Sequence, residues 1–389
     1  MKKVAFITSS LANGGAERNI INLSLFLPHG SYKTDIISII NNNEYKDEYG
    51  KQLNSLRITT LLKQRKPLSL TQKVFLSLFV IYNLITLIKK NKYNILIAGH
   101  EYNTFYYTVL CSKLTGTKSM LIVGNNMNAD LRTKALPIRI YHRVCLWISF
   151  RLTNSIICVS KGLKNDTQKK FGVPKGKIKV IYNGFNIPKP ITPKAHKGIR
   201  IITIGRLIKR KGHSHLLKIV KYLNDHEHID SKLTIIGTGI ERNELKKAIL
   251  RLHLTTAVAL VPSAGKKIYK YLNSSDLFVF PSYHEGFGNA IVEAMGCGLP
   301  VVSTKCDFGP NEILHGTTYG ILTSKLKMES LKNPLLSVEE KLFALTIKKL
   351  ANNKKLMTHY QNMSLARAKF FSIENMTTGY DKAILELLK

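Results

Sequence analysis

The stretch Phe280–Thr304, FPSYHEGFGNAIVEAMGCGLPVVST, carries the strongest structural signal in this chain. An apolar run, Leu277–Phe280, ends at a proline, and two glycines soon after it disfavour a helix at that point. A helix over Ala290–Met295 with Asn289 as its N-cap is predicted next, followed by a second apolar run at Pro300–Ser303. Strand, loop, helix and strand in this order indicate a parallel α/β unit.

The same alternation of short apolar runs and longer helical patterns extends over all 389 residues, which is a length typical of two domains. We therefore predict an α/β protein with two Rossmann-like, doubly wound domains that face a cleft. The strands predicted for the first sheet are Val4–Thr8, Ile36–Ile40, Ile58–Leu62, Ile95–Ala98, Met120–Val123, Ile156–Val159 and Ile178–Tyr182. Those predicted for the second are Ile201–Gly205, Leu233–Gly237, Ala257–Val261, Leu277–Phe280, Pro300–Ser303 and Gly320–Leu322.

A proline-rich segment, Asn186–Gly198, separates the two sets of strands and resists both helix and strand. We take it as the linker between an N-terminal, acceptor-side domain over residues 1–187 and a C-terminal, donor-side domain over 199–369. Residues 370–389 have a helical apolar pattern beyond the second sheet. For this helix we raise the hypothesis that it crosses back to the first domain.

The chain is strongly basic, with 59 Lys and Arg against 24 Asp and Glu and a net charge of +35. Residues 1–194 hold 30 basic and 8 acidic side chains, so most of the excess lies in the first half. Such a balance indicates an anionic partner. Nucleic acid is disfavoured, because the sequence has no zinc-finger spacing, RNA-binding aromatic signature or base-reading helix-turn-helix pattern. The partner we expect is the anionic inner leaflet of a membrane.

Two segments are candidates for contact with that membrane. Leu131–Thr153 has no acid and interleaves Arg and Lys with large apolar residues, which fits an interfacial helix or, equally, a helix packed on the sheet with solvated arginines. Val74–Ile88 is apolar but too short to span a bilayer, and we expect a buried or interfacial helix. The apolar run after Met1 is too short for a signal peptide, and five cysteines without metal spacing suit a reducing compartment. The predicted location is cytoplasmic and peripheral.

Loops that follow strands are where ligands bind in parallel sheets. After the first strand, Gly14 and Gly15 allow a ligand to approach the backbone at a helix start, although a plain turn explains a glycine pair as well. After the first strand of the second domain, Arg206 and Lys211 offer a guanidinium fork and a point charge to a diphosphate. The alternative is a solvated basic loop.

In the quoted stretch, Glu285 falls on the loop and Glu293 in the first turns of the helix. The backbone N–H groups of Phe287, Gly288 and Asn289 are predicted to face an anion at the helix N-terminus. Carboxylates beside an anion site suit a ligand with both hydroxyls and phosphates, such as a sugar nucleotide.

With these residues the chain resembles the retaining glycosyltransferases of family four, which have the GT-B fold. Two glutamates separated by seven residues match the paired-glutamate motif of that family, and GRLIKRKG at 205–212 matches its phosphate-binding block. VSKGLKND at 159–166, IYNGFN at 181–186, LTIIGTGIERNELKK at 233–247 and the GGAER loop occur in the expected order. The resemblance covers essentially the whole chain.

The resemblance implies roles for individual residues. Arg206 and Lys211 would hold the donor diphosphate, Glu285 the hydroxyls of the donor sugar, and Glu293 the ribose, while Gly15 would approach the phosphates from the first domain. The reaction would retain the anomeric configuration by same-face attack, without a metal or a cofactor. The donor would be a nucleotide sugar, most simply a UDP-hexose or UDP-N-acetylhexosamine, and the acceptor a glycan or polyprenyl-linked glycan of surface polysaccharide synthesis.

Some positions depart from the pattern of the family. Gly124, Asn125 and Asn126 stand where many relatives have a histidine, and Pro262-Ser263 replaces a usual glycine. His100 and the two asparagines are further candidates for the cleft, although a lone histidine is more often structural. A glycoside hydrolase fits less well because both glutamates accompany phosphate ligands, and an oxidoreductase because no dinucleotide fingerprint is present. A non-catalytic nucleotide-sugar or carbohydrate binding protein is the remaining alternative.

Overall fold

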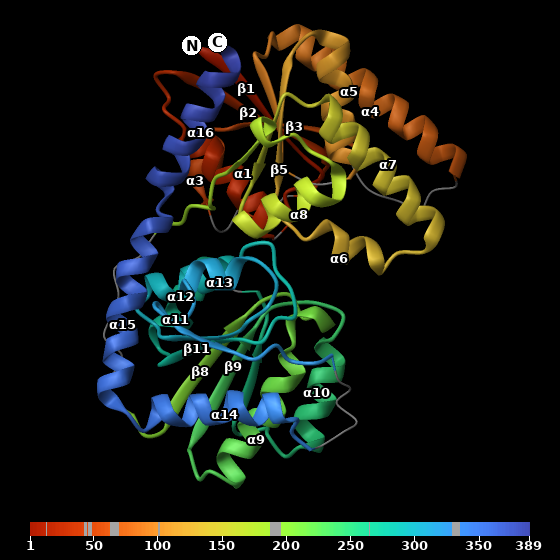
Figure 1. The fold of residues 1–389 in the computed structure, drawn as a ribbon. Helices are drawn as coiled ribbons and strands as arrows, with labels where there is room; N and C mark the ends of the chain where they lie inside the picture. Colours follow the sequence, from red (N-terminus) through yellow and green to blue (C-terminus); the bar gives the residue numbers. More distant parts are fainter. Residues whose placement is uncertain are drawn as a thin grey trace. The chain divides into compact units, whose positions relative to one another are not determined.

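The computed structural model describes residues 1–12, 14–42, 45, 49–62, 70–99, 102–186, 196–263, 265–328 and 335–389. The chain divides into two compact units (Figure 1). The first contains Met1–Gly184 together with Ile373–Lys389, and the second contains Phe185–Ser372. The prediction placed the corresponding boundaries at 187 and 369. The linker predicted over 186–198 lies for the most part outside the described residues.

The first unit is built on a seven-stranded parallel sheet of order β3-β2-β1-β4-β5-β6-β7. All seven predicted strands are present, with ends that differ by a few residues. Their bounds are β1 Lys2–Thr8, β2 Tyr32–Ile40, β3 Arg57–Leu62, β4 Ile95–Ala98, β5 Lys118–Val123, β6 Ser155–Cys158 and β7 Ile178–Val180. Because helices cover both faces, the inner strands are apolar without alternation and almost wholly buried.

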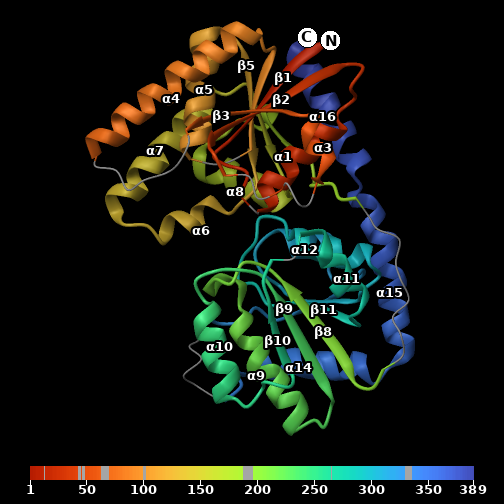
Figure 2. The same ribbon diagram turned by 180° about the vertical axis from the view of Figure 1, so that it is seen from behind.

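Helices on both faces of this sheet complete the first unit (Figure 2). They are α1 Gly15–Phe26, α3 Lys51–Asn54, α4 Leu70–Asn91, α5 Asn103–Thr115, α6 Met127–Arg132, α7 Leu136–Leu152, α8 Lys161–Phe171 and α16 Ile373–Leu388. The C-terminal helix α16 packs beside α1, and Asp381 in it accepts a 2.6 Å hydrogen bond from the Tyr32 hydroxyl of β2. None of the helices in the described part of the chain is long and apolar enough to cross a membrane.

The second unit holds a six-stranded parallel sheet of order β10-β9-β8-β11-β12-β13. Its strands are β8 Ile199–Ile204, β9 Ser231–Ile236, β10 Val258–Val261, β11 Leu277–Phe280, β12 Val301–Thr304 and β13 Ile321–Thr323, again at the predicted places. Its helices are α9 His213–Asp225, α10 Arg242–Arg251, α11 Ile268–Asn273, α12 Asn289–Gly296, α13 Gly309–Leu314, α14 Val338–Ala351 and α15 Lys354–Ala368. The prediction of two doubly wound parallel sheets is therefore confirmed.

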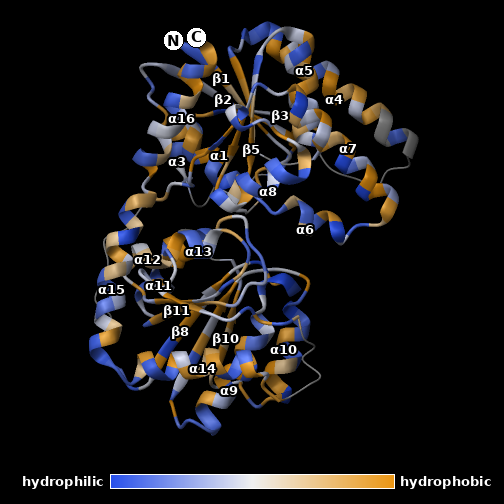
Figure 3. Ribbon diagram, in the orientation of Figure 1, coloured by the Kyte–Doolittle hydropathy of each residue, from blue (hydrophilic) through white to orange (hydrophobic). Residues whose placement is uncertain are grey.

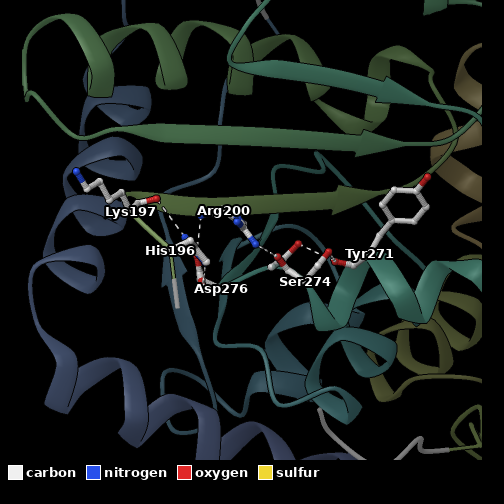
Figure 4. Close-up of polar contacts among 7 residues, drawn as sticks. His196, Lys197, Arg200, Tyr271, Ser274 and Asp276 are labelled. Carbon is white, nitrogen blue, oxygen red and sulfur yellow. Dashed lines mark hydrogen bonds and ion pairs between the residues drawn. The ribbon is translucent and has the colours of Figure 1, made fainter. Parts of the chain in front are cut away.

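Asp276 ties the start of β8 to the start of β11 (Figure 4). One carboxylate oxygen accepts the backbone N–H of Arg200 at 2.7 Å, and the other lies 3.1 Å from His196 Nε2. The backbone N–H of Asp276 donates in return to the Arg200 carbonyl at 2.8 Å. These contacts align the two central strands of the second sheet at their amino ends.

A buried polar network joins α9 to α14 behind the same sheet. Glu340, fully buried at the start of α14, accepts from Lys218 at 2.7 Å and lies 2.6 Å from His215 Nδ1. It also closes a capping box with Ser337. Burial alone would raise the pKa of Glu340, but the hydrogen bonds from His215 and Lys218 outweigh it and hold that pKa below its ordinary value. The network therefore depends on an ionised carboxylate.

We predict that Glu340→Ala lowers the free energy of unfolding by about 3–5 kcal/mol at neutral pH, because it leaves the Lys218 ammonium buried without a counter-charge. Denaturant unfolding measures this. Glu244→Ala, which removes an exposed partner of Lys247 on α10, is the control and should change stability much less.

The pH dependence of this difference follows from the lowered pKa of Glu340. A carboxyl whose pKa is lower in the folded state stabilises the fold above its unfolded pKa of about 4.3, and this contribution is lost as pH falls through the folded value. The gap between wild type and Glu340→Ala should therefore narrow in acid. A gap that stays constant or widens would contradict the assignment.

Candidate active site

The four residues singled out in the second unit all follow its two central strands. Arg206 and Lys211 come after β8, and Glu285 and Glu293 come after β11. The strand order runs outward in opposite directions from β8 and β11, so these strands flank the topological switch point of the sheet. In open parallel sheets the loops at the carboxyl ends of such strands diverge and leave a crevice for a ligand.

Glycines bring the backbones of these loops into close contact. Gly212 has φ +66°, and a Cβ there would lie 2.2 Å from the Pro281 carbonyl oxygen at the end of β11. Gly239, in the loop after β9, would place a Cβ 2.3 Å from the carbonyl oxygen of Leu207. Side chains at these two positions would push the loops apart, so the GRLIKRKG segment needs glycine for its packing as well as for any ligand.

The centre of the site is an ion pair between Lys211 and Glu285. Lys211 Nζ lies 2.5 Å from Glu285 Oε1, and both side chains are largely buried. The ammonium also lies 5.2 Å from the centroid of the Phe280 ring, as expected for a cation–π contact. Burial alone would raise the pKa of Glu285, but the charge and hydrogen bond of Lys211 outweigh this and hold the pKa below its usual range. Glu285 is therefore an ionised acceptor for hydroxyl groups.

Arg206 and His213 lie on either side of Lys211 in the sequence. The Arg206 side chain is exposed, and its backbone carbonyl lies 3.3 Å from His213 Nε2. His213 is buried at the start of α9, where desolvation and the neighbouring Lys211 charge lower its pKa to about 4. It is therefore neutral at physiological pH, so the positive charge on this loop comes from its two lysines, Lys209 and Lys211, and its two arginines.

The loop after β11 leads into α12, and here one prediction is wrong. Gly288, with φ +104°, is the N-cap, and Asn289 is the first helical residue with no side-chain cap hydrogen bond. The left-handed turn places the helix start one residue earlier than an asparagine cap would. Phe287 is buried edge-on against Phe371 at 5.4 Å, so its side chain has a structural role, and only its backbone is available to a ligand. Glu293 is buried in α12.

The predicted site residues of the first unit that the structure describes lie after strands β1 and β5 of its sheet. Gly14 is the N-cap of α1 and its N–H donates to the Tyr45 hydroxyl at 2.8 Å, while Gly15 is the first helical residue and is exposed. Asn126 caps α6 by accepting the Ala129 N–H at 3.1 Å, which gives it a structural function, and Asn125 precedes it in the loop after β5. His100 lies outside the described residues.

A contact that the sequence did not reveal supports the loop of Glu285. His215 Nε2 is hydrogen-bonded to the Tyr283 hydroxyl, and the backbone N–H of Tyr283 donates to the Arg210 carbonyl at 2.9 Å. Tyr283 thereby connects the loop after β11 to the loop after β8 and, through His215, to Glu340. Its place two residues before Glu285 is the only signal in the sequence, since its partners are distant along the chain.

The described part of the chain contains no group of three or more His, Cys, Asp or Glu side chains placed to hold a metal ion. The loop after β8 carries Arg206 and Lys211, and the loop after β11 carries the ionised Glu285 and leads into α12. Cations of this kind can bind an anion, and a carboxylate can accept hydrogen bonds from hydroxyls.

The chain is similar to known glycosyltransferases in sequence and in structure. A Campylobacter jejuni protein named N-acetylgalactosamine-N,N'-diacetylbacillosaminyl-diphospho-undecaprenol 4-alpha-N-acetylgalactosaminyltransferase is 28% identical over 394 residues, covering 95% of this chain and 96% of that protein. An Escherichia coli UDP-Gal:alpha-D-GlcNAc-diphosphoundecaprenol alpha-1,3-galactosyltransferase is 26% identical, covering 66% of this chain and 69% of that protein. Among solved structures, Anabaena HepE in complex with UDP-glucose superposes with a TM-score of 0.76 at 19% identity, covering 99% of this chain and 100% of that one.

Two family models match consecutive parts of the chain. Residues 13–188 match the model described as Glycosyltransferase Family 4, and residues 186–364 match the model described as Glycosyl transferases group 1. The first match covers β2 to β7 of the first sheet, and the second covers all six strands of the second sheet. The chain therefore belongs to the family-four glycosyltransferases and has the GT-B fold.

Proposed function

We propose that this protein transfers a hexose or N-acetylhexosamine from a UDP-sugar to a glycan on a polyprenyl diphosphate carrier, with retention of the anomeric configuration. The observation that carries the proposal is the buried Lys211–Glu285 pair at the switch point between β8 and β11. The pair supports the proposal because an ammonium suits a diphosphate and a carboxylate suits sugar hydroxyls, and a sugar nucleotide offers both groups.

The chemistry of each side chain suggests which part of the donor it binds. An ammonium has three hydrogens, so Lys211 retains donors for phosphate oxygens while bonded to Glu285. The exposed guanidinium of Arg206 presents a planar fork to the same diphosphate. Glu285 accepts hydrogen bonds from the sugar hydroxyls, and Glu293 from the ribose. UDP is the preferred nucleotide because the Anabaena structure holds UDP-glucose and the Escherichia coli relative is named for UDP-Gal.

The chemistry we propose needs no metal ion. As the glycosidic bond to the diphosphate breaks, negative charge grows on the leaving phosphate, and Arg206 and Lys211 stabilise it from fixed positions. The acceptor hydroxyl attacks from the side that the diphosphate leaves, and a phosphate oxygen takes its proton. The protein contributes chiefly by holding the two substrates in position.

The proposed acceptor follows from the relatives. Both the Campylobacter and the Escherichia coli proteins are named for undecaprenol-linked diphosphate acceptors. We therefore propose a role in polysaccharide or lipid-linked oligosaccharide synthesis, at the cytoplasmic face of a membrane. All five cysteines are free and buried, in keeping with a reducing compartment.

Arg206→Ala is expected to lower kcat by about 10²–10³-fold, because it removes a charge-assisted donor to the departing diphosphate. The measurement is transfer, or slow donor hydrolysis, with a panel of UDP- and GDP-sugars. Lys209→Ala, which removes another exposed cation from the same loop, is the matched control and should keep near wild-type turnover. Equal activity of the two variants would refute the role of Arg206.

Chelation should leave turnover unchanged, and added Mg²⁺ or Mn²⁺ should not raise it by more than a small factor, since cationic side chains take the place of the ion. The same reaction mixtures, followed by NMR of the anomeric proton, should show a product with the configuration of the donor. Strict dependence on a divalent ion, or an inverted product, would overturn this part of the proposal.

A further inference from the structure

The ribbons of helices α4 and α7 of the first unit contain many residues coloured as hydrophobic (Figure 3). Several of their large apolar side chains are exposed to solvent. In α4, one face carries Val80, Leu84 and Ile88 into the core. The opposite face exposes side chains spaced as one helical stripe: Phe75, Leu78, Phe79 and Tyr82. Phe75 is 73% exposed and Tyr82 is 69% exposed. One face of α4 therefore packs on the core, and the opposite face has the apolar character of an interfacial helix.

The second helix, α7, has the same two-sided character. It buries Cys145, Leu146 and Phe150 and leaves a stripe of six exposed residues on another face. These are Leu136, Ile140, Arg143, Val144, Trp147 and Arg151. The Arg151 guanidinium lies 5.4 Å from the centroid of the Trp147 ring. The sequence of Leu131–Thr153 fits either an interfacial helix or a helix packed on the sheet with solvated arginines. The interfacial helix is favoured, because α7 has more large apolar side chains than its packed face buries.

Both helices pack on α5, so their exposed stripes belong to one region of the first unit (Figures 1 and 2). Ser77 of α4 is hydrogen-bonded to the Tyr107 hydroxyl of α5 at 2.9 Å. Phe150 of α7 meets Phe105 of α5 edge-on at 6.1 Å. We call the two exposed stripes together the α4–α7 surface.

The charge of this surface indicates its partner. Residues 70–91 of α4 and 131–153 around α7 contain no Asp or Glu, whereas Arg143 and Arg151 lie within the α7 stripe and Lys89 and Lys90 close α4. Aromatic and aliphatic residues interleaved with cations match the interface of an anionic bilayer, where rings enter the headgroup region and cations meet phosphates. A protein partner would more commonly need a charged rim around an apolar centre.

We propose that the α4–α7 surface docks this protein on an anionic membrane. This docking would bring the protein to the membrane that holds the lipid-linked acceptor of the proposed function. The docking proposal itself rests only on the exposed residues of α4 and α7. Docking would confine the protein to the surface on which a polyprenyl-linked acceptor diffuses.

The test is co-sedimentation of the full-length protein with vesicles of phosphatidylglycerol and phosphatidylcholine in equal parts, compared with pure phosphatidylcholine. The protein should sediment with the anionic vesicles only, and less as NaCl rises. Arg143→Glu with Arg151→Glu should weaken binding by at least about tenfold. Phe75→Ser with Phe79→Ser should also weaken it, without removing a charge.

The matched control lies on α10 of the second unit. Lys247→Glu with Leu250→Ser alters a cation whose side chain is 76% exposed and a leucine that is 63% exposed, and it should leave vesicle binding unchanged. Thermal unfolding and size exclusion of all variants verify that they are folded. Vesicle binding requires neither donor nor acceptor, and donor hydrolysis requires no membrane-bound acceptor. Loss of vesicle binding should therefore leave donor hydrolysis unchanged, and donor hydrolysis tests the proposed donor site separately.

Three results would overturn the proposal. One is no binding of the wild type to anionic vesicles at low salt. Another is equal loss in the α10 variant and the α4–α7 variants. The third is a wild-type dimer that the α4 and α7 variants convert to monomer with unchanged vesicle binding, since a second copy would then cover the surface.

Discussion

The pairing of Lys211 with Glu285 is the interaction on which the second domain's site depends. A carboxylate and an ammonium that are both largely buried are stable only in contact, so the loops after β8 and β11 must close on each other. Gly212 permits that approach at the Pro281 carbonyl, and Tyr283 reinforces it from the Arg210 carbonyl to His215. The charge that would receive a diphosphate is therefore positioned by the packing of the sheet.

The fold was predictable because its signals are local. A strand covered on both faces is a short apolar run, and Ile95–Ala98 or Leu277–Phe280 can be recognised without knowledge of their neighbours. The loops after β8 and β11 followed from the same reasoning, since ligands bind at strand ends. The prediction of Asn289 as the cap was wrong because Gly288 adopts a left-handed conformation and caps the helix itself. In a glycine-rich loop, the sequence does not indicate which glycine adopts this conformation.

What the sequence did not reveal depends on tertiary contacts. The partners of Tyr283 lie 68 residues away at His215 and on the loop at Arg210. Nothing in the spacing of Glu285 indicated that it would pair with Lys211. Likewise, the composition of α4 and α7 could not say which apolar side chains pack on α5 and which face solvent, and that division separates a core helix from a docking surface.

The central claim is that a sugar nucleotide binds at the loops after β8 and β11. Hydrogen–deuterium exchange of the intact protein, with and without UDP-glucose, tests it most directly. The account predicts slower exchange in peptides covering residues 205–213 and 282–293, and unchanged exchange in α10. Slowing confined to other peptides, or none at a concentration that supports turnover, would contradict it.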